Sequence, residues 1–339
     1  MSALKQDFNL RQYNTFNIEV FCKYFTEVSD LNDFLDIIKL SEFRHSEKLI
    51  LGGGSNILFS KDFDGFVLKN NIKSIQIIAE SEDDVYVKVG AGEVWHEFVM
   101  WCIERNFAGV ENLSLIPGNV GASPMQNIGA YGVEIKDVFH SLEAVNIETG
   151  QLKNFSLSEC EFGYRESVFK RKLRNQFLIT SVTYKLNKKP KFNISYGTIS
   201  QELERIGVKE LSIKAISDAV ISIRRSKLPS PNEIGNAGSF FKNPEVTKEF
   251  HLELKISYPD IVAYEQASGN IKLAAGWLIE HAGWKGYKHG NAGVHDKQAL
   301  VLVNHGGAKG KEIFDLSTKI MDSVFSKFGV SLEREVNIY

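Results

Sequence analysis

Two glycine-dense segments constrain this chain more than any other feature of its sequence. LGGGSNIL occupies residues 51–58 and PGNVGASPMQNIGAYG occupies residues 117–132, with a strand-rich stretch between them. Glycine tolerates positive φ and lets main chains approach closely, so two such loops can direct two runs of backbone N–H groups at one bulky anionic ligand. The pair predicts a dinucleotide cofactor, although each loop taken alone is just as typical of a tight turn.

Neither loop matches a standard phosphate-binding motif. A G-x-G-x-x-G fingerprint that starts at Gly52 and Gly54 would need a third glycine where Ile57 stands. The segment GGAKGKE at 306–312 lacks the Ser or Thr that follows the lysine of a Walker loop. The cofactor must be held in another way, and the side chains of Asn56, Ser123 and Asn127 offer further hydrogen-bond donors.

The composition is that of a globular, soluble protein without a polyanionic partner. The chain has 339 residues, 43% of them hydrophobic, which is enough for a large core and, on length, about two domains. A net charge of −2 gives no positive field to attract nucleic acid. The N-terminal segment lacks the apolar region of a signal peptide and no stretch is apolar enough for a membrane span, so we expect a cytoplasmic protein with no membrane partner. Cys22, Cys102 and Cys160 are odd in number and far apart, which predicts reduced thiols.

Hydrophobic periodicity predicts interleaved strands and helices. In residues 93–107, apolar side chains at helical spacing predict a helix that leads into the second glycine loop. Residues 187–210 are interrupted by lysine, proline and glycine, which predicts an insertion or linker. The remaining predicted strands are 48–51, 65–69, 72–78, 85–89, 138–147, 151–155, 176–186, 239–243, 299–304 and 331–339, and the remaining helices are 212–228, 246–257, 273–282 and 310–328. Because strands and helices do not alternate strictly, we expect an α+β fold.

Eight ordered segments carry a resemblance to a known family. They are LGGGSN, IPGNVGASPMQNIGAYG, YRESVFK, SYG, SKLP, NAGSFFKNP, AAGWLIE and LEREV, and they span essentially the whole chain. In this order they resemble the UDP-N-acetylenolpyruvoylglucosamine reductases, flavoenzymes of peptidoglycan precursor synthesis. SYG at 195–197 is similar to the longer of the family's two types, which carries an extra segment there.

The resemblance implies the fold and the division of the chain. We expect an FAD-binding fold of the vanillyl-alcohol-oxidase type together with a separate α+β substrate domain. One FAD-binding lobe would comprise residues 1–70 and be completed by 329–339, and a second lobe would comprise 71–186. The insertion would then be 187–210 and the substrate-binding domain 211–328.

The resemblance also implies the reaction. NADPH reduces FAD and leaves, and the enolpyruvyl ether of UDP-N-acetylglucosamine takes its place. Hydride adds to the methylene carbon of that ether, the adjacent carbon is protonated, and UDP-N-acetylmuramate results. The implied partners are this UDP-sugar and NADPH, with no nucleic acid and no membrane. We expect a monomeric oxidoreductase that serves cell-wall biogenesis, and through it cell shape and cell division.

Binding residues follow from the matched motifs. The main chain of the two loops is expected to wrap the FAD pyrophosphate, since N–H groups bind it without loss of side-chain entropy. The cofactor-binding positions are Gly52, Gly53, Gly54, Ser55, Asn56, Pro117, Gly118, Val120, Gly121, Ala122, Gln126, Asn127 and Gly129. The substrate-binding positions are Tyr131, Tyr196, Lys227, Asn243 and Gln298, of which Lys227 supplies a mobile ammonium for a diphosphate.

The catalytic positions implied by the resemblance are Arg165, Ser239 and Glu335. Hydride addition to an unsaturated carboxylate places negative charge on the carboxylate oxygens, so it needs a fixed positive charge there and a proton source at the adjacent carbon. The guanidinium of Arg165 can bind a carboxylate with two hydrogen bonds, and Ser239 matches the family's proton donor. Glu335 would face the same charge and must be protonated or hydrogen-bonded. Glu333, two residues away on the same strand face, is the residue most easily confused with it.

Each catalytic assignment has a plainer alternative in the residues themselves. Arg165 begins a basic run and could be solvated, a serine after glycine is usually a turn residue, and a glutamate on a closing strand is usually exposed. Two departures from the family pattern are Asn337, where an arginine often stands, and Asn119, where Ser or Thr is usual. Asn119 can still donate a hydrogen bond.

Other functions remain open at this point. A flavin oxidase or hydroxy-acid dehydrogenase of the same superfamily would keep the glycine loops but not SKLP and NAGSFFKNP. A non-catalytic sensor of sugar nucleotide or flavin could keep Lys227 and Tyr196 without the catalytic residues, all three of which are present here. The chain has eight histidines, but none forms H-E-x-x-H, so we expect no metal.

Overall fold

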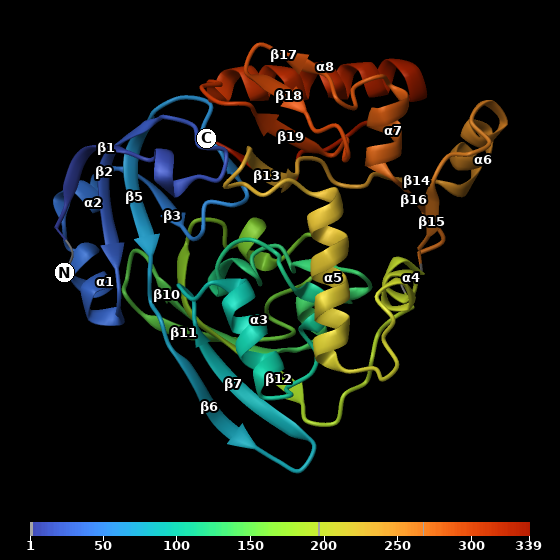
Figure 1. Cartoon of the computed structure of the whole chain (residues 1–339). Coiled ribbons are helices and arrows are strands. Elements are labelled where there is room, and N and C mark those ends of the chain that lie inside the picture. Colours follow the sequence, from blue (N-terminus) through green and yellow to red (C-terminus); the bar gives the residue numbers. More distant parts are fainter. Residues whose placement is uncertain (1–2, 196, 267) are drawn as a thin grey trace. The chain divides into compact units, whose positions relative to one another are not determined.

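The structure is a computed structural model that describes residues 3–195, 197–266 and 268–339 (Figure 1). Its contacts divide the chain into two compact units. The first unit comprises Met1–Phe8, Cys22–Gly53 and Asp64–Ser226, and the second comprises Asn9–Phe21, Gly54–Phe63 and Lys227–Tyr339. The first glycine loop passes from one unit to the other between Gly53 and Gly54. The domain boundaries expected from the sequence rest on function and remain a prediction.

A five-stranded antiparallel sheet forms the centre of the first unit, with strand order β11-β10-β12-β7-β6. Its strands are β6 (Ile75–Glu80), β7 (Asp84–Gly90), β10 (Phe139–Asn146), β11 (Leu152–Ser156) and β12 (Phe177–Asn187). The helix α3 (Trp95–Glu104) buries its apolar side chains in one cluster with those of β7 and β12. This is the helix that the spacing of apolar residues predicts before the second glycine loop.

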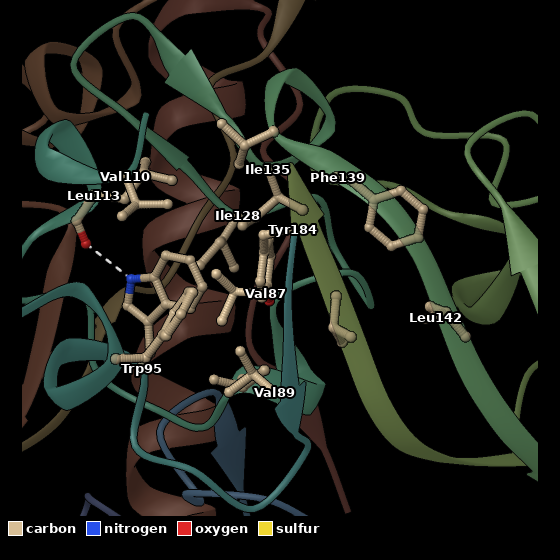
Figure 2. Packing of buried hydrophobic residues seen from close by; sticks show 14 of the residues in the cluster. Val87, Val89, Trp95, Val110, Leu113, Ile128, Ile135, Phe139, Leu142 and Tyr184 are labelled. Carbon is tan, nitrogen blue, oxygen red and sulfur yellow. Dashed lines mark hydrogen bonds between the residues drawn. The ribbon is translucent and has the colours of Figure 1, made fainter. Parts of the chain in front are cut away.

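Aromatic side chains lock α3 to the sheet. Figure 2 shows Trp95 beside Val87 and Tyr184, with the indole N–H donating to the carbonyl of Leu113. That hydrogen bond is 2.9 Å long, and the Tyr184 hydroxyl lies 2.7 Å from the hydroxyl of Ser123 in the second glycine loop. The second glycine loop and the segment just before it are therefore tied to this aromatic cluster.

A second sheet of the first unit has strand order β1-β2-β5-β3. Its strands are β1 (Lys5–Asn9), β2 (Phe21–Val28), β3 (Glu47–Leu51) and β5 (Phe63–Asn70), of which β3 and β5 are parallel. Two short helices, α1 (Leu31–Ile37) and α2 (Ser41–His45), pack their phenylalanines against Phe66 and Leu68 of β5. The first glycine loop begins where β3 ends, at Leu51.

The segment expected to be a linker contains a helix. The helix α4 (Gly197–Arg205) lies within residues 187–210, and its buried residues Ile199 and Leu203 pack against α5 (Ile213–Lys227). The interrupting lysines, proline and glycine hid this short helix, although its two buried residues stand at i and i+4. The helix α5 agrees with its prediction to within a residue at either end.

The second unit combines short sheets with helices. Its main sheet has strand order β13-β19-β18-β17, and a smaller sheet has strand order β14-β16-β15. The elements are β4 (Ile57–Leu58), β13 (Gly235–Ser239), β14 (Glu245–Val246), α6 (Lys248–Ser257), β15 (Ala263–Glu265), β16 (Ile271–Leu273), α7 (Ala275–His281), β17 (Lys288–His289), β18 (Ala292–Val294), β19 (Val301–Asn304), α8 (Gly310–Phe328) and β20 (Asn337–Ile338). The helix α8 contacts β18, β19 and α7 and ends at Gly329, which has a φ of 67°.

Two predicted strands of this unit differ from those observed. The strand expected at 239–243 is displaced, because β13 already ends at Ser239. The final strand is reduced to β20, which pairs in parallel with β4. Just before β20, residues 333–335 pair with residues 240–242, which follow β13. This pairing is one isolated antiparallel bridge, between Phe241 and Arg334, and does not extend into a regular ladder.

The three cysteines are buried and carry free thiols, as predicted. Burial raises the pKa of Cys22 to about 11 and that of Cys160 to about 12, so both thiols stay protonated near neutral pH. Among the helices of the described residues, none is long and apolar enough to cross a membrane.

Candidate active site

The two glycine loops approach each other within the first unit. A Cβ added to Gly53 would lie 2.7 Å from Oδ1 of Asn119 and 2.8 Å from Cα of Gly118. An added Cβ on Gly52 would be at an ordinary contact distance of 3.8 Å from Cβ of Asn119. Only glycine therefore fits at residue 53, and the loops expected to share one ligand do lie side by side.

The second loop is fixed to the chain that precedes α3. The N–H of Trp95 donates to the carbonyl of Gly118 at 2.9 Å, and the N–H of Val120 donates to the carbonyl of Glu93 at 2.8 Å. The side-chain amide of Asn119 donates to the carbonyl of Gly92 at 2.5 Å. Asn119 thus keeps the donor function expected of it, although its side chain binds protein.

Three backbone N–H groups at the meeting point of the loops have no acceptor. They belong to Gly53, Gly118 and Asn119, and no hydrogen bond from any of them reaches another described residue. Asn119 is 8% exposed, and a buried N–H without a partner is rare in proteins. A narrow, glycine-lined cradle with unpaired N–H groups fits the pyrophosphate of FAD.

The three side chains expected to assist the loops are bonded to protein instead. The Ser123 hydroxyl pairs with Tyr184. The Asn127 amide donates to Gly163 and Glu134, and the Asn56 amide donates to the carbonyl of Glu335. Their direct contact with the cofactor remains a prediction. In the structure, these side chains stabilise the conformation of the loops.

Arg165 sits at a strained position next to the second loop. The segment 163–166 closes with hydrogen bonds in both directions between Gly163 and Glu166, and Arg165 has a φ of 54°. Its guanidinium Nη2 donates to the carbonyl of Gly129 at 2.6 Å, and Asn127 holds the carbonyl of Gly163 at 3.0 Å. A non-glycine residue in the left-handed region costs free energy, and such residues gather at functional sites.

Tyr131 occupies the turn of a short hairpin formed by β8 (Gly129–Ala130) and β9 (Val133–Glu134). Tyr131 has a φ of 50° and Gly132 a φ of 80°. Positive φ at both central residues is typical of a type I′ turn, in which Asn-Gly is the usual sequence and tyrosine is unusual. The Asn112 side chain donates to the Tyr131 carbonyl at 3.0 Å and holds the turn in place.

Ser239 and Glu335 lie close together in the second unit. The N–H of Glu335 donates to the carbonyl of Phe240 at 2.8 Å, and Phe241 forms a bridge with Arg334. Ser239 is exposed at the end of β13, and its hydroxyl has no hydrogen-bond partner within the described ranges. The irregular pairing of β13 with β19 lies between Asn236 and Ser239, and a bulge of this kind redirects the side chain that follows it.

The two neighbouring glutamates have different surroundings. Glu333 is exposed and forms an ion pair with Lys242, whereas Glu335 is half-buried. Between them, Arg334 donates to Ser317 at 2.8 Å and to Thr318 at 2.6 Å, both in α8. Because alternate residues of an extended segment point to opposite sides, anchoring Arg334 to α8 turns Glu333 and Glu335 the other way.

Three of the other predicted substrate positions, Lys227, Asn243 and Gln298, belong to the second unit. Asn243 accepts from the N–H of Ala275 at 3.0 Å, and Oε1 of Gln298 lies 3.1 Å from where a Cβ of Gly276 would be. Asn243 and Gln298 therefore both lie at the start of α7. Lys227 is exposed, and Tyr196 lies outside the described residues.

The structure thus brings together Arg165 with the hairpin of Tyr131 in one unit, and Ser239 with Glu335 in the other. The expected meeting of Arg165 with Ser239 and Glu335 remains a prediction. Clusters of three or more His, Cys, Asp or Glu side chains that could hold a metal ion are absent from the described part of the chain.

Comparison with known proteins identifies the family. Residues 230–339 match the model of the UDP-N-acetylenolpyruvoylglucosamine reductase C-terminal domain, and residues 22–156 match an FAD binding domain. The UDP-N-acetylenolpyruvoylglucosamine reductase of Flavobacterium johnsoniae is 50% identical over 336 residues, which cover 99% of both chains. That of Pseudomonas putida is 49% identical and covers 99% of this chain and 98% of its own.

This chain belongs to the UDP-N-acetylenolpyruvoylglucosamine reductase family. The solved reductase of Thermus caldophilus superposes with a TM-score of 0.69 at 20% identity over 100% of this chain and 99% of its own. p-Cresol methylhydroxylase superposes with a TM-score of 0.53 at 11% identity over 96% of this chain and 84% of its own. These two likenesses confirm the α+β FAD-binding fold, and the family membership makes the chain an FAD-containing oxidoreductase.

Sequence reasoning missed several residues that shape the candidate site. Arg334 and Asn112 act through contacts with distant segments, and no local pattern reveals them. Arg224 lies beside Tyr131 and Arg165. The only sequence signal for Arg224 is the Arg-Arg pair just before the SKLP segment, within the predicted helix 212–228.

Proposed function

We propose that this chain reduces the enolpyruvyl ether of UDP-N-acetylglucosamine to UDP-N-acetylmuramate, with NADPH as reductant and FAD as cofactor. The observation that carries the proposal is 50% identity with a UDP-N-acetylenolpyruvoylglucosamine reductase over 99% of both chains. The contacts of Arg165, Ser239 and Glu335 support the proposal, because each of these residues belongs to a hydrogen-bonded segment of main chain.

The cofactor would be held by main chain. The unpaired N–H groups of Gly53, Gly118 and Asn119 are suited to an anionic pyrophosphate, and the anchoring of the second loop to residues before α3 keeps these groups aligned without a ligand. FAD, when bound, supplies transfer of a hydride from NADPH to the substrate. The protein contributes binding, orientation and proton transfer.

The side chains divide the remaining work. The Arg165 guanidinium binds the carboxylate of the enolpyruvyl group and stabilises the negative charge that develops there. The Ser239 hydroxyl delivers a proton to the carbon next to that carboxylate. Glu335, in protonated form, donates a hydrogen bond to the carboxylate from the neighbouring segment. Tyr196, Lys227, Asn243 and Gln298 bind the sugar nucleotide, with the Lys227 ammonium facing the diphosphate.

The direct test is steady-state turnover with defined substrates. Purified holoenzyme should oxidise NADPH only when the enolpyruvyl sugar nucleotide is present, and mass spectrometry should show UDP-N-acetylmuramate as the product. Rapid NADPH oxidation with oxygen alone, without stimulation by the sugar nucleotide, would support a flavin oxidase. Tight binding of the sugar nucleotide without turnover would support a non-catalytic sensor. Either result would overturn the proposal.

A further inference from the structure

The imidazole of His96 acts as a hydrogen-bond acceptor beside the second glycine loop. His96 belongs to the first turn of α3 and is half-buried. Its Nδ1 accepts from the backbone N–H of Leu115 at 3.0 Å. An imidazole nitrogen that accepts a hydrogen bond carries no proton, so His96 is neutral here and has its proton on Nε2.

Leu115 has a strained backbone conformation. Its φ is 59°, in the left-handed region that costs free energy for any residue except glycine. The preceding residue, Ser114, is completely buried, and its hydroxyl lies 2.7 Å from that of Ser217 in α5. A strained residue persists only where its surroundings determine its conformation, and here α3 and α5 do so from two directions.

The conformation of Leu115 sets the direction in which the second glycine loop begins. Ile116 is restricted to extended conformations because Pro117 follows it, and the ring of Pro117 fixes its own φ. Little conformational freedom therefore remains between Leu115 and Gly118. A change at Leu115 would move Gly118, whose N–H is one of the unpaired donors of the two loops.

Two adjacent residues of α3 hold this segment at three points. The indole N–H of Trp95 donates to the carbonyl of Leu113 at 2.9 Å (Figure 2), and the backbone N–H of Trp95 donates to the carbonyl of Gly118 at 2.9 Å. The contact of His96 with Leu115 lies between these two. The imidazole therefore fixes the middle of the segment, where the backbone is strained.

The charged groups that act on His96 keep it in the acceptor form. Arg225 and Arg224 come from α5, and Glu97 comes from α3. Burial and the charges of the two arginines lower the pKa of His96, and Glu97 opposes them. The neutral imidazole therefore predominates near neutral pH, and the acceptor is lost as the pH falls through the lowered pKa.

We propose that His96 is a positioning residue for FAD: its neutral imidazole holds Leu115 in the left-handed conformation and so keeps the unpaired N–H groups of the second loop aligned for the pyrophosphate. These groups belong to Gly118 and Asn119. This inference rests on the proposed function, in which the glycine loops bind FAD, and adds to it a side chain that acts on the cofactor through the main chain. FAD should therefore bind more weakly in acid, because a protonated imidazole offers no acceptor to Leu115.

The test measures how tightly the holoenzyme holds FAD at each pH. Diluted holoenzyme is equilibrated between about pH 5 and pH 8, and free FAD is separated from bound FAD by ultrafiltration. The wild type should lose about tenfold in affinity toward the acid end, as expected when one hydrogen bond that supports a strained residue is lost. His96→Leu lacks the acceptor, so it should show this weaker binding at every pH.

Two variants distinguish positioning from a purely structural role. His96→Asn supplies an oxygen acceptor that does not titrate, so it should bind FAD like the neutral wild type at every pH. Leu115→Gly, combined with His96→Leu, should recover part of the lost affinity, because glycine adopts a positive φ without strain. An imidazole that only filled space would produce neither result. His96→Asn also keeps the test open if His96→Leu does not fold.

His140 provides a matched control. It lies exposed in β10 of the same unit, so His140→Asn makes the same substitution away from the glycine loops. This variant should keep both the affinity for FAD and the pH dependence of the wild type.

The outcomes separate the inference from the proposed function. Gly53→Ala, which disturbs the contact between the two loops, serves as the reference. If Gly53→Ala loses FAD while His96→Leu binds it as tightly as the wild type, only the inference is overturned. A His96→Asn protein with the pH dependence of the wild type would overturn it as well. If Gly53→Ala and His96→Leu both retain FAD fully, the proposed binding of FAD by the glycine loops is in error.

Discussion

Glu335 donates its backbone N–H to the carbonyl of Phe240 at 2.8 Å. Because Phe240 directly follows Ser239, this bond brings the main chain of Glu335 next to that of Ser239. The contact joins the last segment of the chain to the end of β13. The neighbouring Arg334 donates hydrogen bonds to the hydroxyl groups of Ser317 and Thr318, which fix it to α8. Two proposed reactive groups of different chemistry thus have fixed positions in one unit.

Glu335→Gln should lower the rate of substrate reduction about 100-fold, in the range typical of groups that assist proton transfer. Glu333→Gln is the matched control, because Glu333 is exposed and paired with Lys242. It should retain nearly wild-type rates. Single-turnover kinetics of the prereduced variants with the enolpyruvyl sugar nucleotide measure the effect, and equal rates for the two variants would show that the assignment of Glu335 is wrong.

Ser239→Ala should accept hydride from NADPH at the normal rate and then stall. The hydroxyl is exposed and is proposed to act only when the carbon next to the carboxylate is protonated. Reduction by NADPH and reoxidation by substrate are followed separately from the flavin absorbance. Normal reoxidation of the variant would remove Ser239 from the mechanism.

Gly53→Ala should release FAD. The added Cβ would lie 2.7 Å from Oδ1 of Asn119 and 2.8 Å from Cα of Gly118, and separating the two loops would weaken cofactor binding about tenfold or more. Gly197→Ala is the control, since its Cβ would have no neighbour within 4 Å. The ratio of flavin to protein absorbance after purification reports the result. A Gly53→Ala protein that retains its full complement of FAD would show that the contact between the two loops is not needed to bind the cofactor.

Glu111→Gln should change how stability depends on pH. Glu111 is 3% exposed and accepts from the N–H of Gly109 at 2.6 Å. Burial raises its pKa, and three backbone hydrogen bonds only partly oppose this. A carboxyl whose pKa is raised by folding stabilises the fold below its unfolded pKa, and this stabilisation is lost as the pH rises through the folded value.

The Glu111 variant should therefore be more stable than the wild type near neutral pH, with a difference that shrinks as the pH falls toward 4.5, the pKa of an unperturbed glutamate. Thermal unfolding across this pH range measures it. Glu253→Gln, at an exposed position of α6, should follow the wild type at every pH. A constant difference between Glu111→Gln and the wild type would show that burial does not control this carboxyl.

The sequence predicted elements whose signal is local. The apolar spacing of α3 and α8 locates both helices, because a helix repeats its buried face every three to four residues. The short helix α4 was missed because only two of its residues are buried, and the nearby lysines, proline and glycine suggested a linker. The bulge before Ser239 also has no sequence signal, since it depends on pairing with β19.

The site shows the same limit. The glycine loops were recognisable because close main-chain approach demands glycine, and Gly53 meets Gly118 and Asn119 for that reason. The positive φ of Arg165 and Tyr131 could not be predicted, since these residue types normally avoid that region. The proximity of Arg224 to Tyr131 and Arg165 has no sequence signal either, since it depends on packing between distant segments.

One measurement tests the central claim most directly: the flavin spectrum of the holoenzyme, followed without oxygen through two additions. We expect one equivalent of NADPH to bleach the flavin, and one equivalent of UDP-N-acetylglucosamine enolpyruvate then to restore its colour with formation of UDP-N-acetylmuramate. A bleached flavin that regains its colour only when oxygen is admitted would contradict the account.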